Sequence, residues 1–469
     1  MLESIIVRLM PDAAGVSRRQ RISDWIGLVG LTLFCFFSLL SVAGASLGLV
    51  LMLFGLLISP EAWRHLPRQP LFWVSLLSAA YVALRAVWPT LEIVGDPEIQ
   101  SNQAKDWALL FLFFIPAWWI SRTPSRSLFA LNLMFIGFTL GILTALDGEF
   151  ISRFQAGVRS GLHFGKPIIF GFDCAVAILA LTALAAHDFS LGPEPLKRKR
   201  PLRIALALFG MLFFLQGLIV SQSRGVWLAL LVALPAAILI LRYAGGPPHP
   251  LEVKERWWGL AGGVTILGLV LLLNWGTITG RLTQERHELG AAISEGLEEA
   301  PLSSITYRLH LWKFGIDKWL ERPFTGWGPG TTYALIDAEN SVALKNPGGK
   351  SFDHLHNAYL EVLLQLGLTG LLLTLLCAAL MLRCILADYR RGNLSIPMLA
   401  FLLSNFVLIA IYSLTDFRHL HWNWRFYWLI LAGIVLAHRL DISPKRTGRS
   451  GLHHPYSKGG LEATRRHSW

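Results

Sequence analysis

The chain has 469 residues, of which 54% are hydrophobic and only 15% are charged, and its mean hydropathy is +0.50. Soluble domains of this length do not carry so many unbroken apolar runs, so the composition indicates an all-α polytopic membrane protein. The net charge of +12 is largely explained by basic residues in alternate loops. We therefore expect membrane lipids, and no nucleic acid, among the partners.

Twelve apolar stretches of membrane-spanning length follow one another along the chain. The polar start up to Asp24 is not followed by a small-residue cleavage site, so we expect no cleavable signal peptide. The sequence predicts spans at 25–40, 42–58, 71–88, 107–120, 128–146, 168–186, 202–220, 226–241, 258–276, 358–387, 396–414 and 424–440.

Basic residues fall in every second loop between these stretches. They include the runs at 18–21 and 197–200, the pair Arg390-Arg391 and the tail after residue 440. Because loops rich in Lys and Arg stay in the cytoplasm, we expect both termini inside the cell and the other loops on the outer side of the membrane.

One hydrophilic stretch interrupts the apolar pattern between the ninth and tenth predicted spans. Within it, Leu309, Trp312, Ile316 and Leu320 recur at helical spacing, which predicts an amphipathic helix lying against the outer interface. We expect four parts: spans at 1–276, a periplasmic loop at 277–357, further spans at 358–440 and a basic cytoplasmic tail at 441–469.

Several familiar signatures of chemistry are absent from the sequence. It contains no P-loop, no dinucleotide glycine pattern and no zinc-ligand cluster of the HExxH kind. The four cysteines lie in or near apolar spans and have no metal-ligand spacing. We expect no cofactor and no metal, so any energy for a reaction must come from an activated substrate.

Arginines on the expected periplasmic side point to an anionic ligand, since guanidinium groups match phosphate oxygens. Arg224 follows a very short turn at the start of a helix, where free backbone amides add to its own charge. The alternative is an arginine that extends to lipid headgroups. Arg308 begins the amphipathic helix and is expected to face the base of the loop.

His356 stands at the mouth of the tenth span and is the best candidate for a general base. The helix N-terminus favours its neutral form. His354 lies two residues earlier, so position alone leaves open which imidazole acts, while Asn357 can orient its neighbour or contact a sugar hydroxyl. Gly367 would lie about 16 Å further along a continuous helix, where it and Gly370 would serve close helix packing.

The string His356-Asn357, nine residues and Gly367-x-x-Gly370 resembles the H[NSQ]x9GxxG motif of bacterial O-antigen ligases of the WaaL type. Arg224-Gly-Val-Trp-Leu228 is similar to their Rx3L motif, and Arg308 occupies the place of their second loop arginine. The resemblance implies a fold of the glycosyltransferase C type with one large helical periplasmic loop. It also implies transfer of O-antigen polysaccharide from undecaprenyl diphosphate to lipid A-core, with inversion and without a metal.

By the same resemblance, Arg224 and Arg308 hold the leaving diphosphate and His356 deprotonates the acceptor. Asp416 would orient a substrate or an arginine, and Arg159, His163 and Lys166 would line the site. An O-antigen polymerase or a protein O-oligosaccharyltransferase of the same superfamily remains an alternative. A lipid-linked sugar transporter is a further one, although the chain shows no internal repeat.

Overall fold

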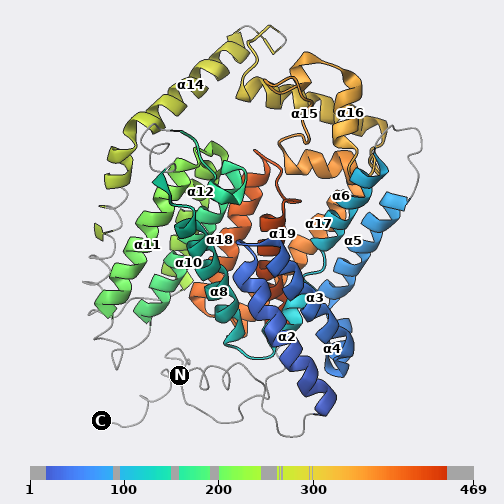
Figure 1. Cartoon of the computed structure of the whole chain (residues 1–469), viewed down its shortest axis with the longest axis vertical. Coiled ribbons are helices and arrows are strands. Elements are labelled where there is room, and N and C mark those ends of the chain that lie inside the picture. Colours follow the sequence, from blue (N-terminus) through green and yellow to red (C-terminus); the bar gives the residue numbers. More distant parts are fainter. Residues whose placement is uncertain are drawn as a thin grey trace, which may run out of the picture.

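The computed structural model describes residues 17–87, 96–148, 158–190, 200–244, 261–262, 265, 268–294, 296–297 and 299–440. Within these residues the chain is almost entirely helical, and the only extended pairing is an isolated bridge between Lys345 and Ser351. The longer helices form a bundle with α14, α15 and α16 grouped at one end, called here the loop end (Figure 1). The other end of the bundle is called the opposite end.

The helices run in the following order along the described chain. They are α2 (Arg18–Phe37), α3 (Val42–Ile58), α4 (Pro60–His65), α5 (Pro70–Val87), α6 (Pro97–Leu109), α7 (Phe114–Ser121), α8 (Arg126–Thr144), α10 (Pro167–Ser190), α11 (Arg200–Val220), α12 (Arg224–Ala244), α14 (Trp275–Ser294), α15 (Ser304–Glu321), α16 (Thr332–Glu339), α17 (Ala358–Arg390), α18 (Ile396–Ser413) and α19 (Trp422–Arg439).

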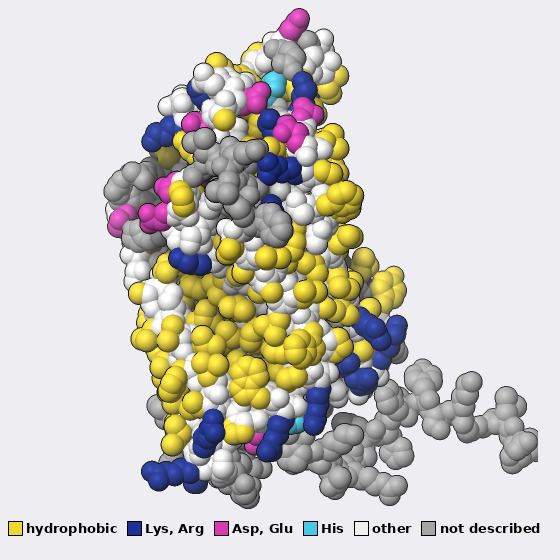
Figure 2. All heavy atoms as spheres, turned by 90° about the vertical axis from the view of Figure 1, so that its right-hand side faces the viewer, with side chains coloured by type: hydrophobic (Ala, Val, Ile, Leu, Met, Phe, Trp, Pro, Cys, Tyr) yellow, Lys and Arg dark blue, Asp and Glu magenta, His cyan; other side chains and the backbone are white. Residues whose placement is uncertain are grey.

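Seven of these segments are long and apolar enough to cross a membrane, or eight if α3 and the bent segment after it form one span. A band of hydrophobic side chains covers the middle of the molecule, with charged side chains above and below it (Figure 2). The chain is therefore a multi-pass membrane protein. The described residues do not bear out twelve spans: α2 opens on charged residues, the apolar part of α11 is short, and much of 258–276 lies outside the described residues.

Small residues set the closest helix contacts. A Cβ atom on Gly30 of α2 would lie 2.8 Å from the carbonyl oxygen of Gly48 in α3, so only glycine permits this approach. At the opposite end, Arg122 has both partners that a buried guanidinium needs, because it pairs with Asp24 at 3.1 Å and with Glu61 at 2.6 Å. These contacts join α2 to α3, to α4 and to the end of α7.

α17 is not the continuous helix that the sequence suggested. Gly367 interrupts it with φ 67° and ψ −171°, a conformation open essentially to glycine alone. A Cβ atom there would lie 2.4 Å from the backbone of Phe324, and the amide of Leu368 donates to the carbonyl of Pro323 at 2.8 Å. The expectation of helix–helix packing at Gly367 is therefore wrong. The break at this glycine allows the segment after α15 to pack directly against the backbone of α17.

The docked segment is held from a second side by α5. The Arg85 guanidinium donates to the carbonyls of Thr325 and Gly326, both at 2.9 Å, and the Tyr81 hydroxyl donates to the Leu366 carbonyl at 2.7 Å. These bonds satisfy backbone carbonyls of the segment after α15 and of the residue just before the break. The first part of α17 is thus fixed relative to α15.

α15 covers the segment expected to be an amphipathic helix, but its buried face differs from the expected one. Leu311, Phe314 and Gly315 are buried, and the Leu355 side chain lies directly over Gly315. Ile316 and Leu320 are 41% and 60% exposed. The buried face of α15 is therefore the one that packs against the residues just before α17. The division at 276, 357 and 440 stays a prediction, and residues 441–469 lie outside the described part.

Candidate functional site

The turn before α17 brings two histidines together. His354 and His356 have ring centroids 4.1 Å apart, and His356 has a φ of 52°, which is uncommon for a residue other than glycine. Asn357 caps α17 by accepting from the amides of Tyr359 and Leu360, and its own amide group donates to the Leu414 carbonyl at 3.3 Å. A backbone held in this conformation fixes the direction of the His356 ring.

Glu361, one turn into α17, also positions this turn. Its carboxylate is fully buried and accepts from the backbone amide of Leu355 at 2.8 Å, and from Thr332 and Gln365 at 2.5 and 2.7 Å. Glu361 was not among the site residues expected from the sequence. Glu361 lies one turn inside an expected span, four residues after the Asn357 cap. A carboxylate inside a span is unfavourable unless it has a function, so this position could have marked Glu361 as a site residue.

Asp416, which follows α18, faces both imidazoles. Its Oδ1 atom lies 3.5 Å from His356 Nδ1, 3.9 Å from His354 Nε2 and 3.6 Å from Arg418 Nε. Burial by itself raises the pKa of Asp416, but the His356 ring and the Arg418 guanidinium outweigh it and leave this pKa below its ordinary value. We call these four residues the His–Asp cluster; Arg418 is a member that the sequence analysis missed.

The two histidines of this cluster differ in what their ring nitrogens can do. His354 Nδ1 accepts from the His356 amide at 3.1 Å, so its proton is on Nε2, which faces Asp353 at 3.4 Å. Burial, His356 and Arg418 hold the pKa of His354 well below its ordinary value. For His356, a proton on Nδ1 faces Asp416 and leaves Nε2 as an acceptor. Only His356 therefore has a nitrogen left to accept a proton.

Arg224, Arg281 and Arg308 all lie within electrostatic reach of Arg159, beside this cluster. Burial, followed by the charge on Arg281, lowers the pKa of Arg159, and burial followed by Arg224 lowers that of Arg308, while Asp416 acts in the other direction on both. We call Arg159, Arg224, Arg281 and Arg308 the arginine cluster. Positive charges gathered in this way are stabilised by a bound anion.

Two atoms of the arginine cluster are buried donors without a hydrogen-bond partner in the described part of the chain: Arg224 Nη1 and Arg308 Nε. Buried donors are rarely left unsatisfied, so they indicate room for an acceptor. Arg224 Nε pairs with Glu285 of α14 at 2.7 Å. A carboxylate of the chain itself thus contacts one of the guanidinium groups.

The other arginines of the cluster shape the turn before α12. Arg159 donates to the Ser221 carbonyl at 2.8 Å and to the Ser223 hydroxyl at 3.3 Å, and Arg281 donates to the Gln222 side chain at 2.9 Å. These contacts fix the turn that places Arg224 at the start of its helix. Arg281 and Glu285 were not among the expected site residues, because the sequence of a solvent-exposed helix gives no signal of what it faces.

The remaining expected residues lie near the His–Asp cluster or cannot be placed. Lys166 Nζ is 3.6 Å from Asp353, which in turn faces His354. The backbone of His163 forms part of a short 3₁₀ turn at Leu162–Phe164, but its side chain lies outside the described residues.

His354, His356 and Asp416 offer ligand atoms within 4.8 Å of one another, a donor set that a divalent cation could use. Arg418 lies 3.6 Å from the same carboxylate, and the arginine cluster is close by, so the surrounding charge disfavours a cation. The expectation of a metal-independent site stays a prediction.

A comparison with protein families bears on the same region. Residues 209–375 match the family model described as O-antigen ligase. This part of the chain is similar to O-antigen ligases, and we call it the O-antigen ligase-type segment. The O-antigen ligase-type segment includes Arg224, Arg308, His354, His356 and the break at Gly367, whereas Asp416 lies beyond it. A comparison with curated proteins gives no match.

Proposed function

We propose that this protein is an O-antigen ligase, which transfers O-antigen polysaccharide from undecaprenyl diphosphate to a sugar hydroxyl of lipid A-core. The observation that carries the proposal is the His–Asp cluster standing beside the arginine cluster within and next to an O-antigen ligase-type segment. A glycosyl transfer from a diphosphate needs a general base next to an anion-binding site.

The proposed reaction is a single displacement. His356 Nε2 takes the proton from the acceptor hydroxyl, and the oxygen forms a bond to the anomeric carbon from the face opposite the diphosphate. The bond between that carbon and the diphosphate oxygen breaks, and undecaprenyl diphosphate leaves with the electron pair. One base and a good leaving group are sufficient for inversion, so neither a carboxylate nucleophile nor ATP is required.

In this proposal the arginine cluster binds the diphosphate and the His–Asp cluster accepts the proton. Arg224 and Arg308 compensate the charge that develops on the leaving diphosphate, and their unpartnered donors Nη1 and Nε supply hydrogen bonds to it. Asp416 holds the proton on His356 Nδ1 and stabilises the imidazolium formed during transfer. Asn357, Arg159, His163, His354 and Lys166 line or support the site.

The proposed setting is the bacterial inner membrane, with the loop end in the periplasm and both chain ends in the cytoplasm. The support is the excess of Lys and Arg in the loops assigned to the other side. We retain twelve spans of the glycosyltransferase C type as part of the proposal. A reporter enzyme fused after Arg200 should act in the cytoplasm, and one fused near Leu335 should act in the periplasm.

Lipopolysaccharide from a strain lacking the gene tests the activity. A ligase predicts complete core without O-chains, together with accumulated lipid-linked polymer, and rescue by the wild-type gene but not by His356→Asn. Core that carries single repeat units would instead identify a polymerase. Normal lipopolysaccharide with unglycosylated proteins would identify a protein O-oligosaccharyltransferase.

A further inference from the structure

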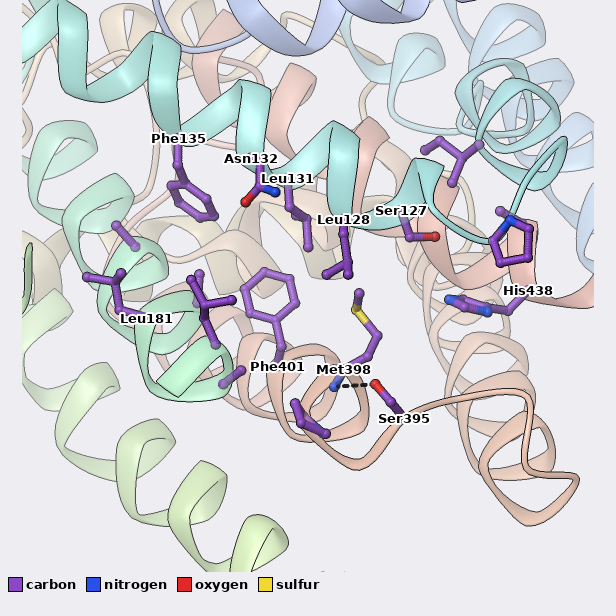
Figure 3. Close-up of a pocket in the computed structure, with 18 of the residues that line it drawn as sticks. Ser127, Leu128, Leu131, Asn132, Phe135, Leu181, Ser395, Met398, Phe401 and His438 are labelled. Atoms are coloured by element: carbon purple, nitrogen blue, oxygen red, sulfur yellow. Dashed lines mark hydrogen bonds between the residues drawn. The ribbon is translucent and has the colours of Figure 1, made fainter. Parts of the chain in front are cut away.

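A cavity lies at the opposite end of the bundle, away from both clusters. It has a volume of about 470 Å³ and is enclosed by α8, α10, α11, α18 and α19 (Figure 3). Most of its wall is apolar and includes Leu131, Leu181, Phe214, Met398 and Phe401. A cavity lined in this way inside a membrane bundle suits a hydrocarbon chain.

The cavity is bordered by residues on the membrane-facing surface. Leu128 on α8 and Leu184 on α10 both belong to its wall and are 46% and 43% exposed. Its lining on α8 runs from Ser127 to Phe135, which spans about 12 Å along the helix axis. This is close to the hydrocarbon depth of one leaflet, roughly 15 Å, so a lipid of the adjacent leaflet can reach in from the side.

Asn132 marks one polar position in this wall. It lies on the exposed side of α8, and its amide points into the cavity (Figure 3). It is about 9 Å along the helix from Arg126, and it forms no hydrogen bond within the described part of the chain. A primary amide at this depth is unfavourable in hydrocarbon unless it has a partner. A glycerophospholipid whose acyl chain fills the cavity carries an ester carbonyl that can accept from this amide.

Two exposed arginines lie close in sequence to the lining of the cavity. Asn393 and Ser395 line it, and they belong to the turn that follows Arg390 and Arg391 at the end of α17. The Arg391 side chain is 61% exposed and lies 3.9 Å from Asp388, whose carboxylate also accepts from Arg439 at 3.0 Å. Exposed arginines at the edge of a bilayer attract anionic headgroups.

We propose that this cavity binds an anionic diacyl phospholipid from the leaflet at the opposite end. One acyl chain enters between α8, α10 and α18, an ester carbonyl accepts from Asn132, and the headgroup phosphate lies at Arg390 and Arg391. An isoprenoid tail offers no polar atom for Asn132, so the amide favours a glycerolipid. This site does not depend on the proposed transferase activity.

Photocrosslinking of the full-length protein in lipid nanodiscs tests the proposal. The probes are phosphatidylglycerol and phosphatidylcholine, each with a diazirine at the same position of one acyl chain, and the labelled peptides are mapped by mass spectrometry. We expect phosphatidylglycerol to label α8 between Leu128 and Phe135 and the start of α18. Equal labelling by phosphatidylcholine, or preferential labelling by an isoprenoid probe, would overturn the assignment.

Matched variants separate the cavity from the general lipid surface. Ala180→Phe fills the cavity from α10 and should reduce labelling to background, whereas Ala80→Phe, at an exposed alanine on α5, should not. Asn132→Leu should weaken phosphatidylglycerol binding without changing the volume much, and Arg390→Ala with Arg391→Ala should abolish the preference for the anionic lipid. Unchanged labelling in Ala180→Phe and Asn132→Leu proteins that elute as folded monodisperse species would refute the site.

Discussion

His356 Nδ1 lies 3.5 Å from Asp416 Oδ1, across the junction between the start of α17 and the end of α18. The carboxylate faces one nitrogen of the ring and leaves the other directed away from it. This relationship distinguishes His356 from His354, whose two nitrogens both face groups of the chain itself. The following predictions start from this relationship and from the arginine cluster.

Replacing the proposed base should stop transfer while leaving donor binding intact. His356→Asn is the sharper variant, because asparagine tolerates the positive φ at this position. We expect the transfer rate to fall about 10²–10⁴-fold, and His354→Gln to have a much smaller effect. The measurement is in vitro transfer with purified protein, repeated with a chelator to test independence from metals. If His356→Asn abolishes donor binding, the imidazole is a phosphate ligand.

The arginine cluster should require guanidinium groups and not merely positive charge. Arg224→Lys and Arg308→Lys should each lose roughly 2–4 kcal/mol of transition-state stabilisation, because an ammonium group cannot make two parallel hydrogen bonds to phosphate. Arg286→Lys, at an exposed arginine on α14, is the matched control and should keep its activity. Turnover by a folded Arg224→Lys protein at the rate of the control would contradict the role.

Glu285 should compete with the donor for Arg224. Its carboxylate lies 2.7 Å from Arg224 Nε, and a diphosphate that uses this nitrogen must displace it. Glu285→Gln should therefore lower the donor KM by up to about fivefold, the range of a partly exposed ion pair, with little change in kcat. Glu321→Gln on α15, which removes an exposed pair with Lys318, is the control. A higher donor KM in Glu285→Gln would show that this carboxylate supports binding.

Gly367→Ala should weaken the attachment of the segment after α15 to α17. The positive φ and the contact with Phe324 both oppose a side chain, and the backbone conformation alone costs about 1–3 kcal/mol. Gly276→Ala in α14 has nothing within 4 Å and should be neutral or stabilising. Limited proteolysis between α15 and α16, together with thermal unfolding, measures both. Equal protection in the two variants would show that the break does not need glycine.

Stability should fall as the pH drops from about 7 to 5. Burial lowers the pKa of His419 to about 3 and that of His421 to about 4, and the pKa of His354 is also well below its ordinary value. The unfolded chain, with histidine pKa values of about 6.5, binds protons in this range that the folded chain does not. Each such histidine therefore lowers the free energy of unfolding by up to about 1.4 kcal/mol per pH unit.

Thermal unfolding at several pH values between 7.5 and 5 tests this dependence. The lowered pKa of Asp416 has no effect in this window, since a carboxylate loses its contribution only below about pH 4. His419→Gln should flatten the dependence, and His287→Gln on the exposed surface of α14 should not. A melting temperature that stays constant down to pH 5 would contradict the prediction.

The class of protein and the residues nearest the proposed chemistry can be recognised from local stretches of sequence. Apolar stretches must be buried in lipid or protein wherever they lie, so their length revealed membrane helices without knowledge of their neighbours. His356, Asn357 and Arg224 were also found locally, because each stands at the start of a helix after a recognisable polar segment.

The distant groups that meet these residues are brought there by the packing of the whole bundle. Asp416 was expected near the site, but its contacts with His356 and Arg418 depend on how α17 and α18 pack. The pairing of Glu285 with Arg224, and the break at Gly367, arise from segments that meet through folding. Local sequence carries the propensity of each helix, whereas contacts between helices follow from packing of the whole bundle, which no single stretch encodes.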